Sequence, residues 1–170
     1  MIYTISAGKH YPEGWNLSGY ALGGVHCGLQ TMTRTVVFTP SALVQPGIPD
    51  CDNDINKLFG WSYGLHQRNS IRVGWRVDSV RQQITLFLYL YESGKRRQVR
   101  LANVKTNTAY DITLNHDHST GALSLKAHNA TYDRSIVNTW KGGKPGCGYG
   151  LGLYHGGNCP AKQDIEIMIR

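Results

Sequence analysis

Apolar and polar residues alternate with period two along most of the chain. This pattern is typical of half-buried β-strands, in which successive side chains point to opposite faces of a sheet. It predicts about ten strands and no helix beyond one short turn. The predicted strands cover residues 2–6, 31–39, 58–65, 70–77, 83–92, 95–102, 108–114, 121–128, 147–154 and 163–169.

Short polar turns join several of these strands, most clearly at residues 92–95 and 117–121. Such turns favour antiparallel hairpins. A longer irregular stretch, residues 41–57, contains two prolines and is expected to be a crossover loop. At 170 residues the chain has the size of one domain. We therefore predict an all-β, two-sheet antiparallel β-sandwich of jelly-roll or concanavalin-like type, in a single domain spanning residues 1–170.

Alternation also assigns the faces of the two central strands. In residues 70–77 the apolar set points to the core, and Arg72 and Arg76 share the opposite face. In residues 83–92 both faces are apolar, because an aromatic row of Phe87, Tyr89 and Tyr91 lies opposite the core leucines. A strand of this kind is either covered on both sides or lines a groove or interface.

The stretch GYGLGLYHGGN has glycine at every second position of a predicted strand. Its glycines leave one strand face bare, and Tyr154 falls beside this strip while Asn158 lies in the following turn. We expect residues 147–154 and 163–169 to form a closing β-hairpin. The bare strip is expected to accommodate the protein's own aromatic residues, a neighbouring subunit or a sugar.

Charge adds a possible partner to this picture. The net charge is +7, and the excess lies in the middle of the chain. A basic surface favours a polyanionic partner such as nucleic acid, an acidic glycan or an acidic protein face. A solvated strand face that keeps the protein soluble explains it equally well. The basic residues there are Arg68, Arg72, Arg76, Arg81, Lys95, Arg96, Arg97, Arg100 and Lys105.

The four cysteines lack paired CxxC spacing. We expect free thiols in a reducing compartment, with a Cys147–Cys159 disulfide as the alternative in an oxidising one. The first residues do not resemble a signal peptide, and the longest apolar run is too short to cross a bilayer. No membrane association is therefore expected.

Metal and cofactor chemistry has little support. The glycines precede a strand rather than a helix, which excludes a phosphate-binding loop. Residues 50–54 alternate carboxylates as calcium loops do, but an EF-hand would need glycine and glutamate where Ile55 and Trp61 stand. An irregular calcium site and a polar turn both remain open there. His116 and His118 are expected in a solvated turn. No cofactor and no metal ligand are predicted.

Among enzymes, a glycan lyase best fits a basic β-sandwich. Arginine would neutralise a uronate while histidine and tyrosine move the proton. The arginine-glutamate-arginine and glutamine-x-histidine signatures of alginate lyases are missing, so no catalytic residue is predicted. Nucleic-acid binding is not expected, since no recognition motif is present. The residues considered for a lyase are Arg72, Arg76, His66, Tyr89 and Tyr154.

Three stretches carry a resemblance to a known group of proteins: HQRNSIRVGWRV, LFLYLYESGKRRQVRLANV and LYHGGNCPAKQDIEIMI. Together they resemble uncharacterised β-sandwich proteins of gut Bacteroidetes and their crass-like tailed phages. The closing loop of those proteins has a different sequence from that around His155 and Ala161. The resemblance implies a virion protein, assembled in the host cytoplasm.

We therefore expect a non-catalytic auxiliary (decoration) or fibre-associated protein of a phage virion, docked on other capsid proteins in a larger assembly. A lectin-like carbohydrate-binding module is the alternative, in which aromatic rings stack on sugars and polar side chains bind hydroxyls or carboxylates. A glycan lyase is the third possibility. The candidate ligand- or partner-binding residues are Arg72, Arg76, Phe87, Tyr89, Tyr91, Tyr154 and Asn158.

Overall fold

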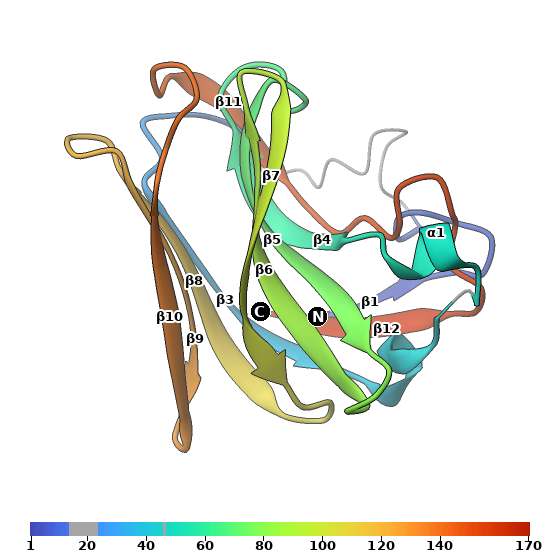
Figure 1. Cartoon of the computed structure of the whole chain (residues 1–170). Helices are drawn as coiled ribbons and strands as arrows, with labels where there is room; N and C mark the ends of the chain where they lie inside the picture. Colours follow the sequence, from blue (N-terminus) through green and yellow to red (C-terminus); the bar gives the residue numbers. More distant parts are fainter. Residues whose placement is uncertain (14–23, 46) are drawn as a thin grey trace.

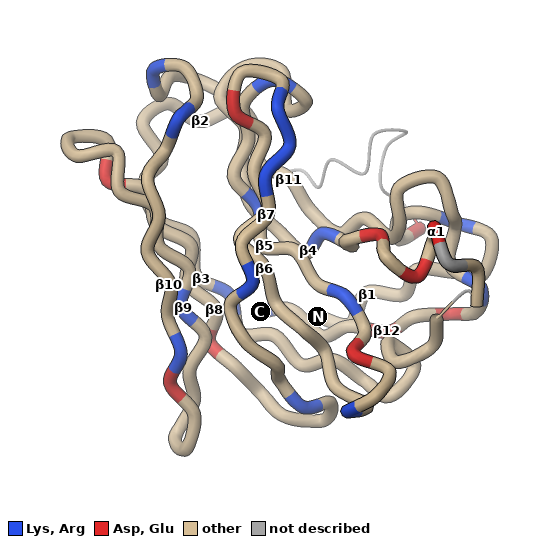
Figure 2. The backbone as a smooth tube through the Cα atoms, in the orientation of Figure 1, with Lys and Arg blue, Asp and Glu red and all other residues tan. Residues whose placement is uncertain are grey.

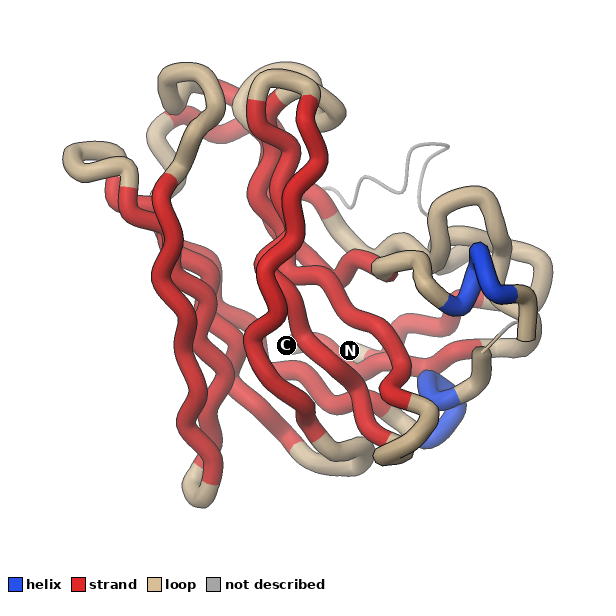
Figure 3. The backbone as a smooth tube through the Cα atoms, viewed as in Figure 1, coloured by secondary structure: helices blue, strands red, loops and turns tan. Residues whose placement is uncertain are grey.

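The computed structural model describes residues 1–13, 24–45 and 47–170. These residues form two antiparallel sheets of six strands each, with the core between them (Figure 1). Strands and loops make up nearly all of the described chain, and the helices are two short turns between β3 and β4 (Figure 3). The predicted all-β, two-sheet antiparallel sandwich is confirmed.

The first sheet has the order β1-β12-β3-β8-β9-β10, and the second has the order β2-β11-β4-β5-β6-β7. The strands of the first sheet are β1 (Ile2–Ile5), β12 (Ile165–Ile169), β3 (Thr31–Phe38), β8 (Ala109–Asp117), β9 (Ala122–Asn129) and β10 (Tyr132–Thr139). Those of the second are β2 (Val25–Cys27), β11 (Cys147–Leu151), β4 (Asn56–Ser62), β5 (Asn69–Asp78), β6 (Gln83–Glu92) and β7 (Lys95–Val104). The helical turns are η1 (Pro40–Leu43) and α1 (Pro49–Asp52).

All ten predicted strands are present, but the prediction missed β2 and β10. Strand β2 has only three residues, too few for a periodic signal. Strand β10 is an edge strand with most of its side chains at least partly exposed, so its sequence carries no apolar stripe. Both hairpin turns expected from the sequence are present, between β6 and β7 and between β8 and β9.

The expected closing hairpin is wrong. Strand β11 pairs with β2 and β4 in the second sheet, whereas β12 pairs with β1 and β3 in the first. Residues 152–164 therefore cross from one sheet to the other. Alternation reveals which side chains share a face of a strand, but it does not reveal which strands are neighbours.

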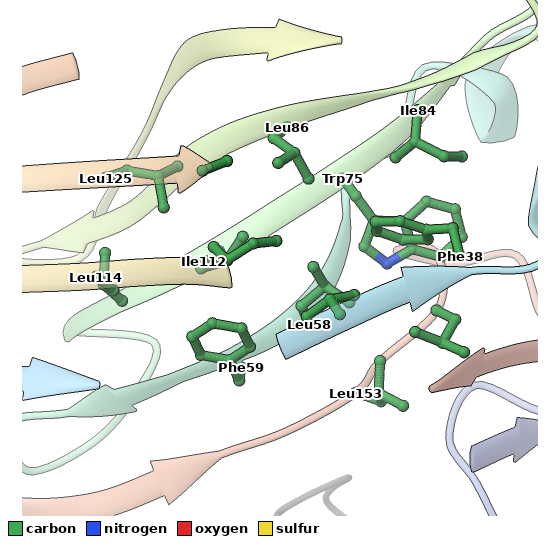
Figure 4. Close-up of a cluster of buried hydrophobic side chains, with 14 of the residues drawn as sticks. Phe38, Leu58, Phe59, Trp75, Ile84, Leu86, Ile112, Leu114, Leu125 and Leu153 are labelled. Carbon is green, nitrogen blue, oxygen red and sulfur yellow. The ribbon is translucent and has the colours of Figure 1, made fainter. Parts of the chain in front are cut away.

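The core lies on the faces of the two central strands that the alternation of apolar residues predicted. The inward side chains of β5 and β6 are buried, and they meet residues of the first sheet such as Ile112 and Leu125 (Figure 4). The Trp75 ring packs against Phe38, with ring centroids 5.4 Å apart. The inward residues of the two central strands are Ile71, Val73, Trp75, Val77, Ile84, Leu86, Leu88 and Leu90.

The glycines of β11 are covered by the protein itself. Gly148 and Gly150 of β11 are buried, and so is Gly152, which directly follows the strand. A β-carbon on Gly148 would lie 1.9 Å from the backbone oxygen of Ser62, so only glycine permits this approach of β11 to β4. Of the possibilities left open by the sequence, the close approach of this chain's own backbone accounts for Gly148.

The expected placement of His116 in a solvated turn is wrong. The residue lies near the end of β8 and is fully buried between the sheets. Its Nδ1 atom is 2.7 Å from the Tyr63 hydroxyl, which also lies 2.9 Å from Nε2 of His118. Burial, with a smaller contribution from His118, lowers the pKa of His116 to about 4. His116 is therefore a neutral core residue at pH 7.

The expectation of free thiols is also wrong, because all four cysteines form disulfides. Cys27 of β2 pairs with Cys147, directly opposite it in β11, and Cys51 of α1 pairs with Cys159. The alternative Cys147–Cys159 pair is not formed. These partners are separated by 120 and 108 residues, so the tertiary fold and not the local sequence brings them together. Disulfides persist in oxidising environments, which fits a protein that functions outside a reducing compartment.

The double substitution Cys27→Ser/Cys147→Ser should lower the free energy of unfolding by about 3 kcal/mol, because the disulfide restricts the unfolded chain over a separation of 120 residues. Urea denaturation followed by tryptophan fluorescence would measure the loss. Peptide mapping without reduction should show the two pairs. Four reactive thiols in unreduced, denatured protein would contradict the assignment.

Candidate functional site

A cavity of about 540 Å³ lies on the face of the second sheet that points away from the core. We call it the basic cavity, because three cations and only one carboxylate line it. Its cations are Lys57, Arg72 and Arg96, and its aromatic residues are Tyr89, Tyr91 and Tyr154. The remaining lining residues are Asp54, Ile55, His66, Gln67, Gly157 and Asn158.

Strand register brings the floor of the cavity together. Arg72 of β5 lies opposite Tyr89 of β6, and Tyr91 lies opposite Arg96 of β7. Residues at alternate positions of β5 face the core, so Arg72 must point to the other side. Figure 2 shows the basic residues of β7 along this edge of the sheet. The floor therefore combines aromatic rings with guanidinium groups.

The segment after β11 forms the wall of the cavity. The backbones of Tyr154 and Lys57 form two hydrogen bonds with each other, with N···O distances of 2.8 and 3.0 Å. The Lys57 ammonium donates to the Gly156 carbonyl at 3.1 Å. The Gly157 N–H donates to Asp54 Oδ2 at 2.8 Å. These bonds hold residues 154–157 against the beginning of β4.

The disulfide Cys51–Cys159 joins the same two segments. Cys51 lies in α1, just before Asp54, and Cys159 directly follows Asn158. A covalent link and several hydrogen bonds thus fix the wall relative to the floor. Such fixed geometry favours a preformed binding site, since less ordering is needed when a ligand binds.

Lys57 lies among aromatic rings in the cavity. Its Nζ atom is 5.1 Å from the ring centroid of Tyr89 and 5.3 Å from that of Tyr154, within cation–π range. Burial is the main cause that lowers its pKa to about 8, and the positive charge of Arg72 adds to the effect. Most Lys57 side chains are therefore still charged at pH 7, so the cavity has a net positive charge.

Three further side chains of the cavity, His66, Tyr89 and Tyr154, are neutral at pH 7. Burial, together with Arg72, lowers the pKa of His66 to about 4. Its Nδ1 atom is 3.0 Å from the Tyr149 hydroxyl. Burial raises the pKa of Tyr89 and of Tyr154, so both keep their hydroxyl protons. The cavity thus offers hydroxyl donors and a neutral imidazole beside its cations.

The basic cavity brings together most of the residues singled out in the sequence. It is lined by Arg72, Tyr89, Tyr91, Tyr154 and Asn158. Arg76 and Phe87 lie outside it. The guanidinium carbon of Arg76 lies 5.5 Å from the centroid of the buried Phe87 ring, and Arg76 lines a second cavity. That these residues bind a ligand or partner stays a prediction.

Sequence reasoning missed Lys57 and Gln67 as candidates. It considered Asp54 only for a calcium site and noted Arg96 only as part of the basic region. Lys57 stands just outside the predicted strand at 58–65, and its position depends on the bridge to Tyr154, which local pattern cannot reveal. Asp54 depends in the same way on the returning segment at Gly157. For Arg96, the hairpin was a usable signal, because it places this residue opposite Tyr91.

Two of the three carboxylates in residues 50–54 accept hydrogen bonds from backbone N–H groups. Asp52 accepts a hydrogen bond from the Gly47 N–H at 2.9 Å, and Asp54 accepts one from Gly157. Cys51 is occupied by its disulfide. Within residues 1–13, 24–45 and 47–170, no three His, Cys, Asp or Glu side chains come together as a metal site would require.

None of the helices in the described part of the chain is long and apolar enough to cross a membrane.

No protein-family model matches the sequence, and no curated protein matches it. Among solved structures, the alginate lyase from Klebsiella pneumoniae is similar, with a TM-score of 0.63 and 9% sequence identity. The match covers 82% of this chain and 56% of the lyase, so the chain spans little more than half of that protein's length. At this identity the likeness shows a shared β-sandwich fold alone.

A second solved structure is the CBM2 module of the evolved Dit of Lactobacillus casei BL23 phage J-1. Its TM-score is 0.44 and its identity 9%, over 82% of this chain and 61% of that chain. This TM-score is too low to show a common fold. The resemblance to proteins of gut Bacteroidetes and crass-like phages is tested by neither structure and stays a prediction.

Proposed function

We propose that the protein binds an acidic polysaccharide in the basic cavity. The observation that carries this proposal is the grouping of three cations and three tyrosines with a single carboxylate, Asp54. That carboxylate already accepts a hydrogen bond from the backbone of Gly157. A negatively charged sugar would balance the excess positive charge of the site.

Each side chain of the cavity would have its own role in ligand recognition. Arg72 presents a planar guanidinium suited to a carboxylate, and Lys57 adds a second positive charge deep in the site. Tyr91 and Tyr154 are partly exposed, so their rings can stack on sugar faces. Tyr89 is only 3% exposed, and its ring instead makes a cation–π contact with the Lys57 ammonium. Asn158 is exposed at the rim, where its amide can bind sugar hydroxyls.

The predicted role as an auxiliary or fibre-associated protein of a phage virion rests on the sequence resemblance, and it stays a prediction. Glycan binding is compatible with it, since a virion protein meets polysaccharides at the cell surface. Docking on other capsid proteins is likewise a proposal that rests on the sequence resemblance.

Affinity for acidic oligosaccharides should fall about tenfold or more in Arg72→Gln, because a hydrogen bond to a charged group contributes roughly 1.5–3 kcal/mol. Isothermal titration calorimetry with oligouronates would measure this loss. Arg96→Gln, at an exposed position of the same cavity, should weaken binding less and is a second test should the first variant fold poorly.

The matched control is Arg134→Gln, an exposed arginine on β10 in the other sheet, which should leave the affinity unchanged. Neutral oligosaccharides of the same length should bind much more weakly than oligouronates. Equal affinity for neutral and acidic chains, or equal losses in the cavity variants and the control, would refute the proposal.

Binding should weaken as the pH rises through about 8, because Lys57 then loses its proton and the cavity loses a positive charge. The sign follows from the charged form: a base with a lowered pKa is cationic below that pKa and neutral above it. Affinities measured at closely spaced pH values should show the fall in the wild type. Lys57→Gln should bind more weakly and lack this dependence, and a flat wild-type profile would contradict the role of Lys57.

A glycan lyase is the second candidate function. The cavity contains four of the five residues considered for it from the sequence, and excludes Arg76. Neutral His66 can accept a proton, and the hydroxyl of Tyr154 can donate one. In a β-elimination the C5–H and C4–O bonds of a uronate break, a C4–C5 double bond forms, and the leaving oxygen takes up a proton. Arg72 would stabilise the carboxylate beside C5.

Ultraviolet absorbance distinguishes the two candidates, because β-elimination creates a conjugated double bond in the product. For a non-catalytic binding protein we expect no absorbance change when polyuronates are incubated with protein that binds them. An absorbance increase that is lost in His66→Gln, with binding retained, would instead establish the lyase.

A further inference from the structure

A second cavity, of about 750 Å³, lies at the other end of the same sheet face. Three strands contribute to it, with Arg76 and Asp78 of β5, Thr85 of β6 and Arg100 of β7. Arg81 of the turn between β5 and β6 also lines it. Arg76 points the same way as Arg72, because the two are an even number of residues apart on one strand. The four-residue offset corresponds to about 13 Å along β5.

The two cavities lie on either side of Ile55. This side chain lies over Gly74, where a β-carbon would come within 2.5 Å of Ile55 Cγ2, and it packs with the Phe87 and Tyr89 rings. Asp54 lines the basic cavity while Asp52 and Asn53 line the second. The segment that carries these residues therefore crosses the face of the sheet between the two sites.

The second cavity retains positive charge for a ligand. Asp78 forms an ion pair with Arg81 at 3.0 Å and accepts a hydrogen bond from Asn103, and the latter is the main cause that lowers the pKa of Asp78 to about 2. Arg76 and Arg100 instead donate to the neutral oxygens Asn53 O and Asn103 Oδ1, at 3.3 and 2.7 Å. Among the ion pairs of the described residues, none involves either of these two guanidinium groups.

We propose that the second cavity binds another acidic unit of the same polysaccharide chain, at Arg76 and Arg100. This inference rests on the proposed function of the basic cavity. One sugar ring cannot reach from Arg72 to Arg76, so the ligand must be a chain of several units that passes over Ile55. Its substrate class is thus a polyuronate or another glycan with repeated acidic groups, rather than a sugar with one terminal acid.

Occupying two sites on one chain raises affinity without any new kind of contact. Once one acidic unit lies in the basic cavity, the next units are held near the second cavity at a high effective concentration, of the order of millimolar. The affinity must then depend on chain length. A ligand too short to span both sites gains nothing from the second one.

The experiment compares an acidic disaccharide with an octasaccharide of the same repeat, by titration calorimetry. In the wild type the octasaccharide should bind about tenfold or more tightly. The double variant Arg76→Gln/Arg100→Gln should lose about that factor for the octasaccharide and keep the disaccharide affinity within about twofold. Arg134→Gln is the matched control and should change neither value.

Equal affinity of the two ligands for the wild type, or equal losses for both ligands in the double variant, would overturn the inference and leave the proposed function standing. Disaccharide binding that Arg72→Gln does not weaken would overturn the proposed function as well. If neither ligand bound the wild type, both the inference and the proposed function would be refuted. Circular dichroism spectra of the variants would show whether a lost affinity reflects misfolding.

Discussion

The antiparallel register between β5 and β6 determines both the core and the candidate site. It pairs Ile71 with Leu90 and Val73 with Leu88 on the buried face, and Arg72 with Tyr89 on the other. A shift of one residue would place Arg72 opposite a leucine, so that either the guanidinium group would enter the core or the leucine would enter the cavity. The cost of burying those charges fixes the register, and the site follows from it.

The features that could be predicted from the sequence are those that depend on the alternation of apolar and polar residues. Faces, strand positions and hairpins follow from period two, which is why Arg72 and Tyr89 could be selected from the sequence alone. Contacts between distant segments follow from no local pattern. Three features depend on such distant contacts: the bridge between Lys57 and Tyr154, the Cys51–Cys159 disulfide, and the placement of β11 and β12 in different sheets.

Distant contacts of this kind explain why the cavity was only partly predicted from the sequence. The arginines and tyrosines of β5, β6 and β7 come from consecutive hairpins, so sequence reasoning reached most of them. The wall comes from the segment that crosses between the sheets. That crossing brings Gly157 to Asp54 and Tyr154 to Lys57, and it is required because the chain must reach β12 in the first sheet.

The charges of the cavity are better explained by binding than by stability. Placing Lys57 beside Arg72 under partial burial costs free energy, as the lowered pKa of Lys57 shows. A methionine or leucine could support the same tyrosine rings without that cost. An excess of positive charge is instead useful where a ligand supplies negative charge, because the ligand then relieves the repulsion between the cations. Repulsion stored in this way favours acidic ligands over neutral ones of the same shape.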